Sequence, residues 1–179
     1  TAVDLAAKAF QRDGKLSGLA TGLRDLDTKM GGLQASDLII VAGRPGMGKT
    51  SLATNIAYNI AKAYRAELQP DGTHKTANGG IVGFFSCEMS ADQLATRIIA
   101  ERTGIPSSNI RRGGITEADF EKIRDYSIEL QSLPFYVDET GGLSISQLTA
   151  RARRLKRQKG LDLIVIDYIQ LLSGSGKRS

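Results

Sequence analysis

The segment with the clearest chemistry is rich in glycine and ends in lysine and threonine. It consists of Gly43, Arg44, Pro45, Gly46, Met47, Gly48, Lys49 and Thr50, and Ser51 follows it. Such glycines let backbone N–H groups converge on a phosphate, and the helix that follows adds the partial positive charge of its N-terminus. The lysine can reach the outer phosphates of a nucleoside triphosphate, and the threonine hydroxyl can join a Mg²⁺ shell. We therefore predict that residues 43–51 bind the phosphates of ATP and that Lys49 also takes part in catalysis.

An aspartate at the end of an apolar run is a candidate partner for this segment. The run Leu163-Ile-Val-Ile166 has the composition of a buried strand and ends at Asp167. An acidic residue at a strand tip beside a phosphate loop can hold Mg²⁺ directly or through water. Four apolar residues followed by aspartate also occur in ordinary strands, so the phosphate loop is what gives the pattern its meaning. We predict Thr50 and Asp167 as metal ligands.

A glutamate after a second apolar run is the candidate general base. The run Ile81-Val-Gly-Phe-Phe-Ser-Cys87 is followed by Glu88. Hydrolysis of ATP needs a group that orients and polarises the attacking water near the γ-phosphate. An acidic residue close to the start of a helix can instead stabilise that helix through its dipole, and a helix is expected just after Ser90. Position alone leaves both roles open for Glu88.

The composition restricts the class of protein. The 179 residues suit one α/β domain, and 41 % hydrophobic and 24 % charged residues are ordinary for a globular chain. Cys87 is the only cysteine, which excludes an intrachain disulfide and fits the reducing cytoplasm. No apolar run approaches the roughly 18 residues that a membrane span needs, and no signal peptide is apparent. The net charge of +5 favours polyanionic partners only weakly, because ATP is itself a polyanion.

Apolar runs and helical patterns alternate along the chain. Ser90 and Gln93 form a capping box for one helix, and Thr116 is suited to cap another. The expected strands are 37–42, 81–87, 135–138 and 161–167, and the expected helices are 1–11, 51–65, 91–103, 116–132 and 144–159. This alternation predicts an α/β fold with a mainly parallel sheet and helices on both faces. Ligands bind beyond the carboxyl ends of such strands, so Gly43, Glu88 and Asp167 are expected to meet in one crevice.

Two segments lie outside this alternation. Residues 69–80 are polar and predict an exposed, mobile loop, in which His74, the only histidine, is solvated rather than catalytic. Thr1 to Gln11 has the apolar spacing of a short amphipathic helix, which is marginal in isolation. This helix either packs on its own domain or docks on another subunit.

The helix expected at 144–159 is strongly basic. It contains Arg151, Arg153, Arg154, Lys156, Arg157 and Lys159. Its apolar residues Leu148, Ala152 and Leu155 follow helical spacing, so the charges are expected on the outer side. Solvation and favourable charge near a helix C-terminus are the usual meaning of such a pattern. Contact with nucleic acid is the alternative, although no aromatic residues are interleaved for base stacking.

With these elements in place, the chain strongly resembles the ATPase domain of DnaB-type replicative helicases. The matching stretches are 21–27 (Thr-Gly-Leu-Arg-Asp-Leu-Asp), 32–42, 43–50, 85–90 (Phe-Ser-Cys-Glu-Met-Ser), 150–154 and 166–172 (Ile-Asp-Tyr-Ile-Gln-Leu-Leu). The Ser-x-Glu-Met and Ile-Asp-Tyr-x-Gln-Leu motifs separate this family from the wider RecA-like group. Glycine stands at positions 43 and 46, where the family often has alanine and serine.

The resemblance implies a RecA-like fold and a homohexameric ring that moves 5′ to 3′ along single-stranded DNA. It implies that Lys49 and Thr50 bind phosphate and Mg²⁺, that Asp167 serves the metal and that Glu88 is the catalytic glutamate. Primase and a helicase loader are the further partners that it implies. Residues 1–18 would form a linker helix and loop, and residues 19–179 the N-terminal part of the RecA-like ATPase domain.

The end of the sequence departs from the family pattern. The DNA-binding loops, the γ-phosphate-sensing glutamine and the arginine finger of the family lie beyond the position that matches Ser179. We therefore expect a truncated ATPase core that unwinds no DNA alone. Two other classes remain open: a RecA-like repair or recombination ATPase, and a regulatory P-loop ATPase without nucleic-acid activity.

Overall fold

The computed structural model of the chain describes residues 1–11, 16, 18–42 and 48–167. Helices and strands alternate along much of this range. In chain order the helices are α1 (Ala2–Gln11), α2 (Arg24–Met30), α3 (Lys49–Lys62), α4 (Ala91–Thr103), α5 (Ser107–Arg112), α6 (Glu117–Ser132) and α7 (Ile145–Lys159). The strands are β1 (Arg65–Leu68), β2 (His74–Asn78), β3 (Val82–Ser86), β4 (Phe135–Asp138) and β5 (Leu163–Asp167).

A parallel sheet with β3 at its centre organises the domain. Within the described residues its strand order is β4-β3-β5, and both neighbours run parallel to β3. The register pairs Val82 with Phe135 and Leu163, and it pairs Ser86 with Asp167. Every residue of β3 is buried, as its continuous apolar run predicts. The predicted α/β fold with a parallel sheet is confirmed, and β3 and β5 end side by side.

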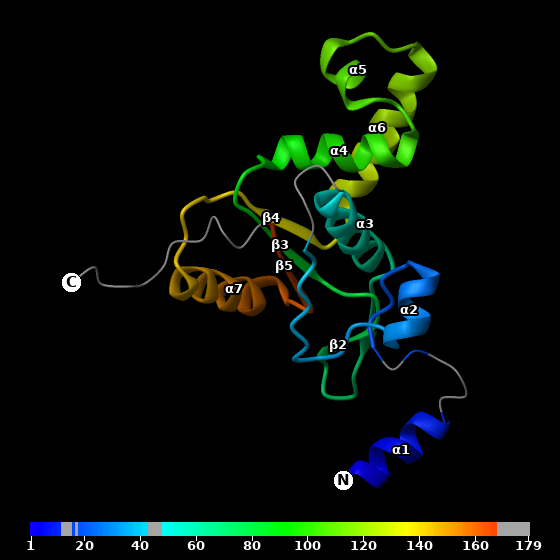
Figure 1. Cartoon of the computed structure of the whole chain (residues 1–179), viewed down its shortest axis with the longest axis vertical. Helices are drawn as coiled ribbons and strands as arrows, with labels where there is room; N and C mark the ends of the chain where they lie inside the picture. Colours follow the sequence, from blue (N-terminus) through cyan, green and yellow to red (C-terminus); the bar gives the residue numbers. More distant parts are fainter. Residues whose placement is uncertain (12–15, 17, 43–47, 168–179) are drawn as a thin grey trace, which may run out of the picture.

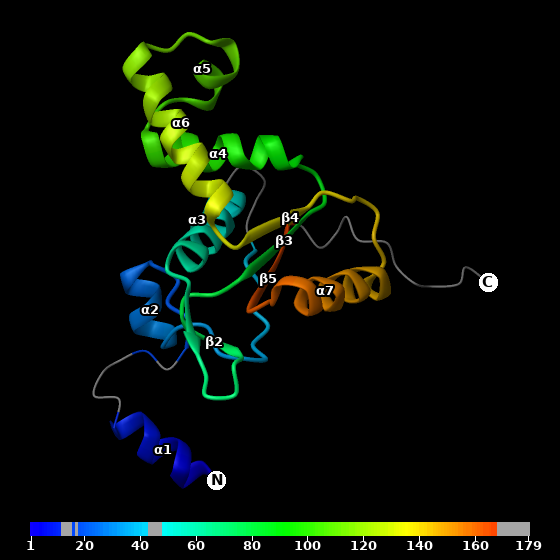
Figure 2. The ribbon, with the colours of Figure 1, turned by 180° about the vertical axis from the view of Figure 1, so that it is seen from behind.

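Helices cover both faces of the sheet (Figures 1 and 2). Val82 and Phe84 face α3 and α4, which form the larger core cluster, whereas Phe85 packs with α7 on the opposite face. This division follows from the period of two along a strand, which sends successive side chains to opposite faces. The phosphate-loop helix α3 and the basic helix α7 therefore lie on opposite sides of the sheet.

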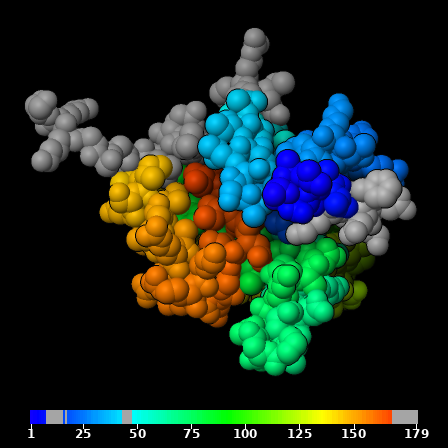
Figure 3. Space-filling model, turned by 90° about the horizontal axis from the view of Figure 1, so that it is seen from below, coloured from blue at the N-terminus to red at the C-terminus, as the bar shows by residue number. Residues whose placement is uncertain are grey.

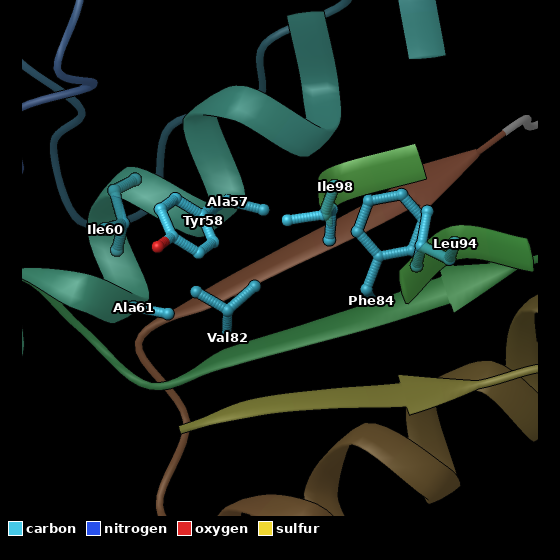
Figure 4. Packing of buried hydrophobic residues seen from close by; sticks show 8 residues of the cluster. All are labelled: Ala57, Tyr58, Ile60, Ala61, Val82, Phe84, Leu94 and Ile98. Atoms are coloured by element: carbon cyan, nitrogen blue, oxygen red, sulfur yellow. The ribbon is translucent and has the colours of Figure 1, made fainter. Parts of the chain in front are cut away.

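The larger core joins three elements that are far apart in the sequence (Figure 4). Phe84 of β3 is fully buried and packs with Leu94 and Ile98 of α4 and with Ala57 of α3. Its ring stacks on Phe135 of β4, with 5.8 Å between the centroids. Burying large apolar side chains in this way is the main favourable term in folding. The core therefore holds α3 and α4 in place against the sheet.

On the other face, a glycine permits α7 to approach the sheet closely. A Cβ atom at Gly83 would lie 3.0 Å from Leu155 Cδ2 and 3.1 Å from Leu161 Cδ1. Contacts that short are tighter than ordinary packing, so a larger residue would push Leu155 and α7 outward. Gly83 in the centre of β3 therefore sets the distance between α7 and the sheet.

The helix starts predicted from capping residues are confirmed. Ser90 caps α4 in a capping box with Gln93. A capping box of Ser144 and Gln147 at the start of α7 was not predicted. Thr116 caps α6 by accepting a hydrogen bond from the Asp119 backbone N–H. Each cap satisfies N–H groups that the first turn of a helix leaves unpaired. These boundaries depend on neighbours in sequence, and the local pattern therefore predicts them well.

The prediction of a loop at 69–80 is wrong in part. The chain forms an antiparallel hairpin of β1 and β2, which pairs Leu68 with His74. The predicted helix at 51–65 accordingly ends at Lys62, and Arg65 begins β1. Backbone pairing and a turn closed by the hydrogen bond from Gln69 N–H to Thr73 O are enough to form these exposed strands. His74 is exposed, in agreement with the expectation that it is solvated.

The prediction of a buried strand at 37–42 is also wrong. These residues form no strand, and Leu38 and Ile40 are 85 % and 77 % exposed. Figure 3 shows this segment in light blue on the surface of the molecule. An apolar run records a tendency to be buried, but burial also requires an element that covers it. Within the described residues the sheet ends at β5, and no strand lies beyond it.

Two parts of the molecule extend away from the sheet (Figures 1 and 2). One is a unit formed by helices α4, α5 and α6. The short helix α5 was not predicted; it lies between Gly104, which ends α4, and Gly113, which ends α5 itself. The predicted N-terminal helix is confirmed as α1. The side chains of residues 1–7 are exposed, with Val3 and Leu5 at 76 % and 68 %.

Candidate active site

The two predicted metal ligands meet in the structure. Asp167 ends β5 on the same face as Leu163 and Val165, which pack toward the core beneath α3. Thr50 lies in the first turn of α3 and donates a hydrogen bond from Oγ1 to Asp167 Oδ2 at 3.0 Å. The alternation of side chains along β5 therefore brings a carboxylate to the start of the phosphate-loop helix.

Helix α3 begins directly after a glycine in a left-handed conformation. Gly48 is the N-cap with φ 77°, a left-handed conformation that favours glycine. Glycine has no side chain that could accept a hydrogen bond. The first backbone N–H groups of α3 are therefore not capped by the side chain of the N-cap residue. Lys49 and Thr50 are half-buried here. The predicted residues Gly43, Arg44, Pro45, Gly46 and Met47 lie outside the described residues.

Ser51, predicted to contact the nucleotide, has a different partner in the structure. Its hydroxyl donates a hydrogen bond to Glu101 Oε1 on α4. This bond joins the first turn of α3 to the helix that follows Glu88. Thr54, one turn later, is buried and bonds back to the carbonyl oxygens of Thr50 and Ser51. The first turn of α3 is thus connected on one side to β5 and on the other to α4.

Glu88 lies in a tight turn after β3, next to the end of β5. The turn is closed by the buried Ser86 hydroxyl, which donates to Met89 O at 2.7 Å and accepts from Met89 N–H at 3.1 Å. The Cys87 N–H donates to Asp167 O at 2.9 Å, which ties the turn to β5. Glu88 itself is exposed. Its backbone is therefore held between two fixed points while its carboxylate faces solvent.

A different carboxylate stabilises the start of α4. Glu139 Oε2 accepts a hydrogen bond from the Ala91 N–H at 2.6 Å, and Ser90 and Gln93 complete the cap. Within the described ranges, no hydrogen bond or ion pair involves the Glu88 carboxylate. Glu139 thus supplies a hydrogen-bonded carboxylate at the start of α4, and the exposed Glu88 carboxylate makes no contact in the described residues that would keep it from a ligand.

The pKa of the Cys87 thiol depends on the charges around this site. Partial burial raises the pKa of its thiol above the usual value, and the nearby carboxylates of Asp167 and Asp138 add to the rise. Desolvation and negative neighbours both disfavour a thiolate. A cation placed beside Asp167 would oppose the effect of that carboxylate on Cys87.

The oxygen donors at this site suit a magnesium ion. Thr50 offers a hydroxyl and Asp167 a carboxylate, and both are hard ligands. No group of three or more His, Cys, Asp or Glu side chains within the described residues could hold a metal ion by itself. Mg²⁺ keeps several waters and binds proteins through one or two side chains together with substrate phosphates. The pair therefore fits a metal that arrives with a nucleotide.

Several interactions around the site were not predicted from the sequence. Asp27, quoted above only as part of a matching stretch, is buried and accepts hydrogen bonds from Thr21 N–H, Thr21 Oγ1 and Gly22 N–H. The Thr21 carbonyl accepts from Asn59 of α3, whose side chain in turn accepts from Arg102 of α4 at 2.9 Å. This chain of polar contacts connects the N-terminal segment to both helices of the site. The Thr21–Asp27 spacing was its only signal in the sequence.

A second unpredicted contact lies on the α7 face. Arg151 Nε donates to Asp138 Oδ2 at 2.6 Å, and Arg151 Nη2 donates to Thr140 Oγ1 at 3.0 Å. A hollow of about 130 Å³ beside this pair is lined by Gly83, Phe85, Tyr136, Val137, Asp138, Arg151 and Leu155. The hollow lies on the α7 side of the sheet, opposite α3.

None of the described helices is long and apolar enough to cross a membrane.

Comparison with known proteins identifies the chain's relatives. The model of the DnaB-like helicase C-terminal domain matches residues 18–179. The replicative DNA helicase DnaB of Rickettsia bellii is 41 % identical over 170 residues, which cover 95 % of this chain and 33 % of that protein. The DnaB helicase of Geobacillus stearothermophilus is 41 % identical over 93 % of this chain and 34 % of its own length. The chain thus spans about a third of the length of the curated relatives it matches.

Solved structures agree with these relatives. An ATPase domain of known structure superimposes with a TM-score of 0.82 and 25 % identity, covering 99 % of this chain and 58 % of that one. A DnaB-like replicative helicase studied with its primase interactions gives a TM-score of 0.79 over 99 % of this chain and 40 % of that chain; at 23 % identity it supports the fold alone. From residue 18 onward the chain therefore belongs to the DnaB-like helicase C-terminal domain family.

Proposed function

We propose that this chain is the nucleotide-binding part of a replicative DNA helicase that is driven by ATP hydrolysis. The observation that carries this proposal is the 3.0 Å hydrogen bond between Thr50 and Asp167. It joins the phosphate-loop helix to the end of β5 across 117 positions of sequence. Membership of the DnaB-like family supports the same function.

Each site residue has a proposed role. Residues 43–48 and Ser51 surround the phosphates with backbone N–H donors, and Lys49 neutralises charge on the β- and γ-phosphates. Thr50 and Asp167 hold Mg²⁺, which supplies charge neutralisation on the phosphates when bound. Glu88 orients and polarises the attacking water, for which its exposed carboxylate beside the end of β5 is suited.

The partners follow from the family. We propose that the whole protein is a cytoplasmic homohexamer on single-stranded DNA that works with primase and a helicase loader. Residues 1–18 form the linker helix and loop, and α1 docks on a neighbouring subunit; the exposure of Val3 and Leu5 supports this role. Residues 19–179 then form the RecA-like ATPase unit.

Nucleotide binding by the chain tests the proposal. Titration with a fluorescent ATP analogue and Mg²⁺ should show binding that Lys49→Ala weakens by roughly tenfold or more, because charge-assisted phosphate contacts are lost. Glu88→Gln should bind like the unaltered chain, and the exposed Lys122→Ala of α6 serves as control. Equal weakening by Glu88→Gln and Lys49→Ala would reassign Glu88 to nucleotide binding or to structure.

Hydrolysis by the whole protein tests the remaining roles. There Glu88→Gln should stop ATP hydrolysis while binding persists, and single-stranded DNA should accelerate hydrolysis by the unaltered protein. A rate unaffected by DNA would favour a regulatory P-loop ATPase. Strand exchange or branch migration without unwinding would favour a repair or recombination ATPase.

The thiol of Cys87 offers a metal test that does not require hydrolysis. Asp167→Asn removes one cause of the raised Cys87 pKa, so alkylation by iodoacetamide near pH 8 should become faster. Mg²⁺ with a nucleotide should change the alkylation rate of the unaltered chain, and EDTA should reverse the change. If Mg²⁺ with nucleotide changed the rates of the chain and of Asp167→Asn equally, Asp167 would not be the ligand.

A further inference from the structure

The hydroxyl of Ser51 is held by a carboxylate from another helix. Ser51 follows Thr50 in the first turn of α3, and its Oγ donates a hydrogen bond to Glu101 Oε1 of α4. Figures 1 and 2 show α4 passing over the end of α3 at which that helix begins. A serine hydroxyl has only one proton to donate. The Ser51 proton is therefore committed to Glu101, at the place where the phosphates of a nucleotide would arrive.

The position of Glu101 is not explained by its own helix. Glu101 lies in the last turn of α4, where the helix dipole disfavours negative charge. It is exposed, and none of the ion pairs among the described residues involves it. The first turn of α3, in contrast, is the positive end of a helix dipole, and its N-cap Gly48 has no side chain. Glu101 thus brings a negative charge to the helix end that favours an anion.

The packing of α4 on α3 does not depend on the bond from Ser51 to Glu101. The neighbouring Arg102 donates from Nη2 to Asn59 Oδ1 of α3 at 2.9 Å. Its guanidinium carbon also lies 4.1 Å from the centre of the Tyr58 ring. These contacts and the buried core already hold the two helices together. An exposed hydrogen bond contributes little beside them, because water can replace it.

We propose that Glu101 lowers the affinity of the nucleotide site by competing with a nucleotide phosphate for the Ser51 hydroxyl. This inference rests on the proposed function, because it requires phosphates at the start of α3. The carboxylate and the phosphate need the same proton and the same positive helix end, and their negative charges repel each other. A bound nucleotide must therefore displace Glu101 from Ser51, which weakens binding. Glu101 acts through Ser51 and is a positioning residue, not a catalytic one.

The direction of the effect separates this role from a structural one. Loss of a residue that only supports the site would weaken nucleotide binding or leave it unchanged. Loss of a competing carboxylate strengthens binding instead. Glu101→Gln keeps the size of the side chain but replaces a charged acceptor with a neutral one, which holds the Ser51 hydroxyl less strongly.

Nucleotide titration of this chain tests the proposal. The probes are a fluorescent ATP analogue with Mg²⁺ and, as its competitor, inorganic tripolyphosphate, which carries phosphates without base or sugar. Glu101→Gln is measured alone and in a Ser51→Ala background. The matched control, Glu121→Gln, removes the same charge from an exposed position on α6. Circular dichroism melting checks that every variant folds.

Glu101→Gln should bind both probes roughly twofold to fivefold more tightly, as expected for a charge interaction at an exposed position. The control should change the affinity by less than about 1.5-fold, because solvent and salt screen distant exposed charges. In the Ser51→Ala background, Glu101→Gln should give no further gain, since the hydroxyl for which the two anions compete is absent.

Four results would overturn the proposal. These are unchanged or weaker binding by Glu101→Gln, an equal gain in the control, an equal gain in the Ser51→Ala background, and a gain confined to the ATP analogue. An equal gain without the Ser51 hydroxyl would show that Glu101 acts only as a general negative charge. If the unaltered chain and Glu101→Gln bound neither probe, the proposed nucleotide site itself would fail, and this inference with it.

Discussion

At the scale of single residues, the predicted ligands are recognisable from residue type and spacing, whereas the unpredicted contacts depend on the folded structure. Thr50 and Asp167 were predicted because a glycine loop and an acid at a strand end form a known chemical pair. Ser86, which closes the Glu88 turn, has an ordinary place in an apolar run. Its role depends on burial at the end of β3, which residue types alone do not reveal. Arg151 was likewise grouped with the solvated charges until its contact with Asp138 was seen.

The Asp138–Arg151 pair predicts how stability depends on pH. Partial burial raises the pKa of Asp138, but hydrogen bonds from Arg151 and Thr140 outweigh burial, so the pKa of Asp138 lies below its usual value of 3.8. A carboxylate with a lowered pKa stabilises the folded state above about pH 4, and this contribution is lost as the pH falls through its folded-state pKa. Asp138→Asn should therefore lower the free energy of unfolding at pH 7, and the difference from the unaltered chain should shrink on acidification.

Urea denaturation at several pH values measures this effect. Asp125→Asn is the control, because its contact with Arg124 is longer, at 3.6 Å, and more exposed. We expect the control to change stability less at pH 7. A difference for Asp138→Asn that stayed constant down to pH 3 would show that the charge of Asp138 does not stabilise the fold.

At the scale of elements, local sequence signals predicted helices well, but they predicted poorly which apolar runs are buried as strands. Caps such as Ser90 and Thr116 are complete within a few residues, so their helices begin where expected. The runs at 37–42 and 82–86 are both mainly apolar, yet β3 is buried between two layers and the other run is exposed. Which run is buried depends on helices and strands from elsewhere in the chain. The β1–β2 hairpin was missed because its strands lack an apolar face.

The close packing of β3 and α7 predicts the result of enlarging a glycine. Gly83→Val should lower the free energy of unfolding by about 1–3 kcal/mol, because the added atoms overlap the Leu155 and Leu161 side chains. Gly114→Val is the control, since a Cβ there meets no atom within 4 Å. Chemical denaturation of both variants gives the comparison. Equal effects would show that backbone preference, and not the α7 contact, limits position 83.

At the scale of the whole molecule, an apolar segment lies uncovered beside an open sheet. Leu38 and Ile40 are more exposed than Ile39 and Val41, at 44 % and 48 %, an alternation that fits an extended backbone. Exposed apolar segments next to unpaired strand edges promote association between chains.

This surface predicts concentration-dependent self-association of the chain. Leu38→Lys/Ile40→Lys should reduce the scattering-derived mass at high concentration and leave the free energy of unfolding nearly unchanged, because neither side chain is buried. Phe120→Lys on α6, also exposed at 55 %, is the control and should have a smaller effect. If the double variant associated as strongly as the unaltered chain, the segment would not be the contact. If it unfolded more easily, the segment would be packed in solution.

The hydrogen bond between Thr50 and Asp167 also has a consequence for how the protein is made. A ribosome adds about 5–20 residues per second, so Asp167 follows Thr50 out of the ribosome after a delay on the order of ten seconds. During that interval α3 can form while Asp167, the second of the two proposed metal ligands, has not yet been made. The nucleotide site that we propose therefore cannot be complete before β5 is made, and a nascent chain halted before β5 carries the glycine-rich loop without Asp167.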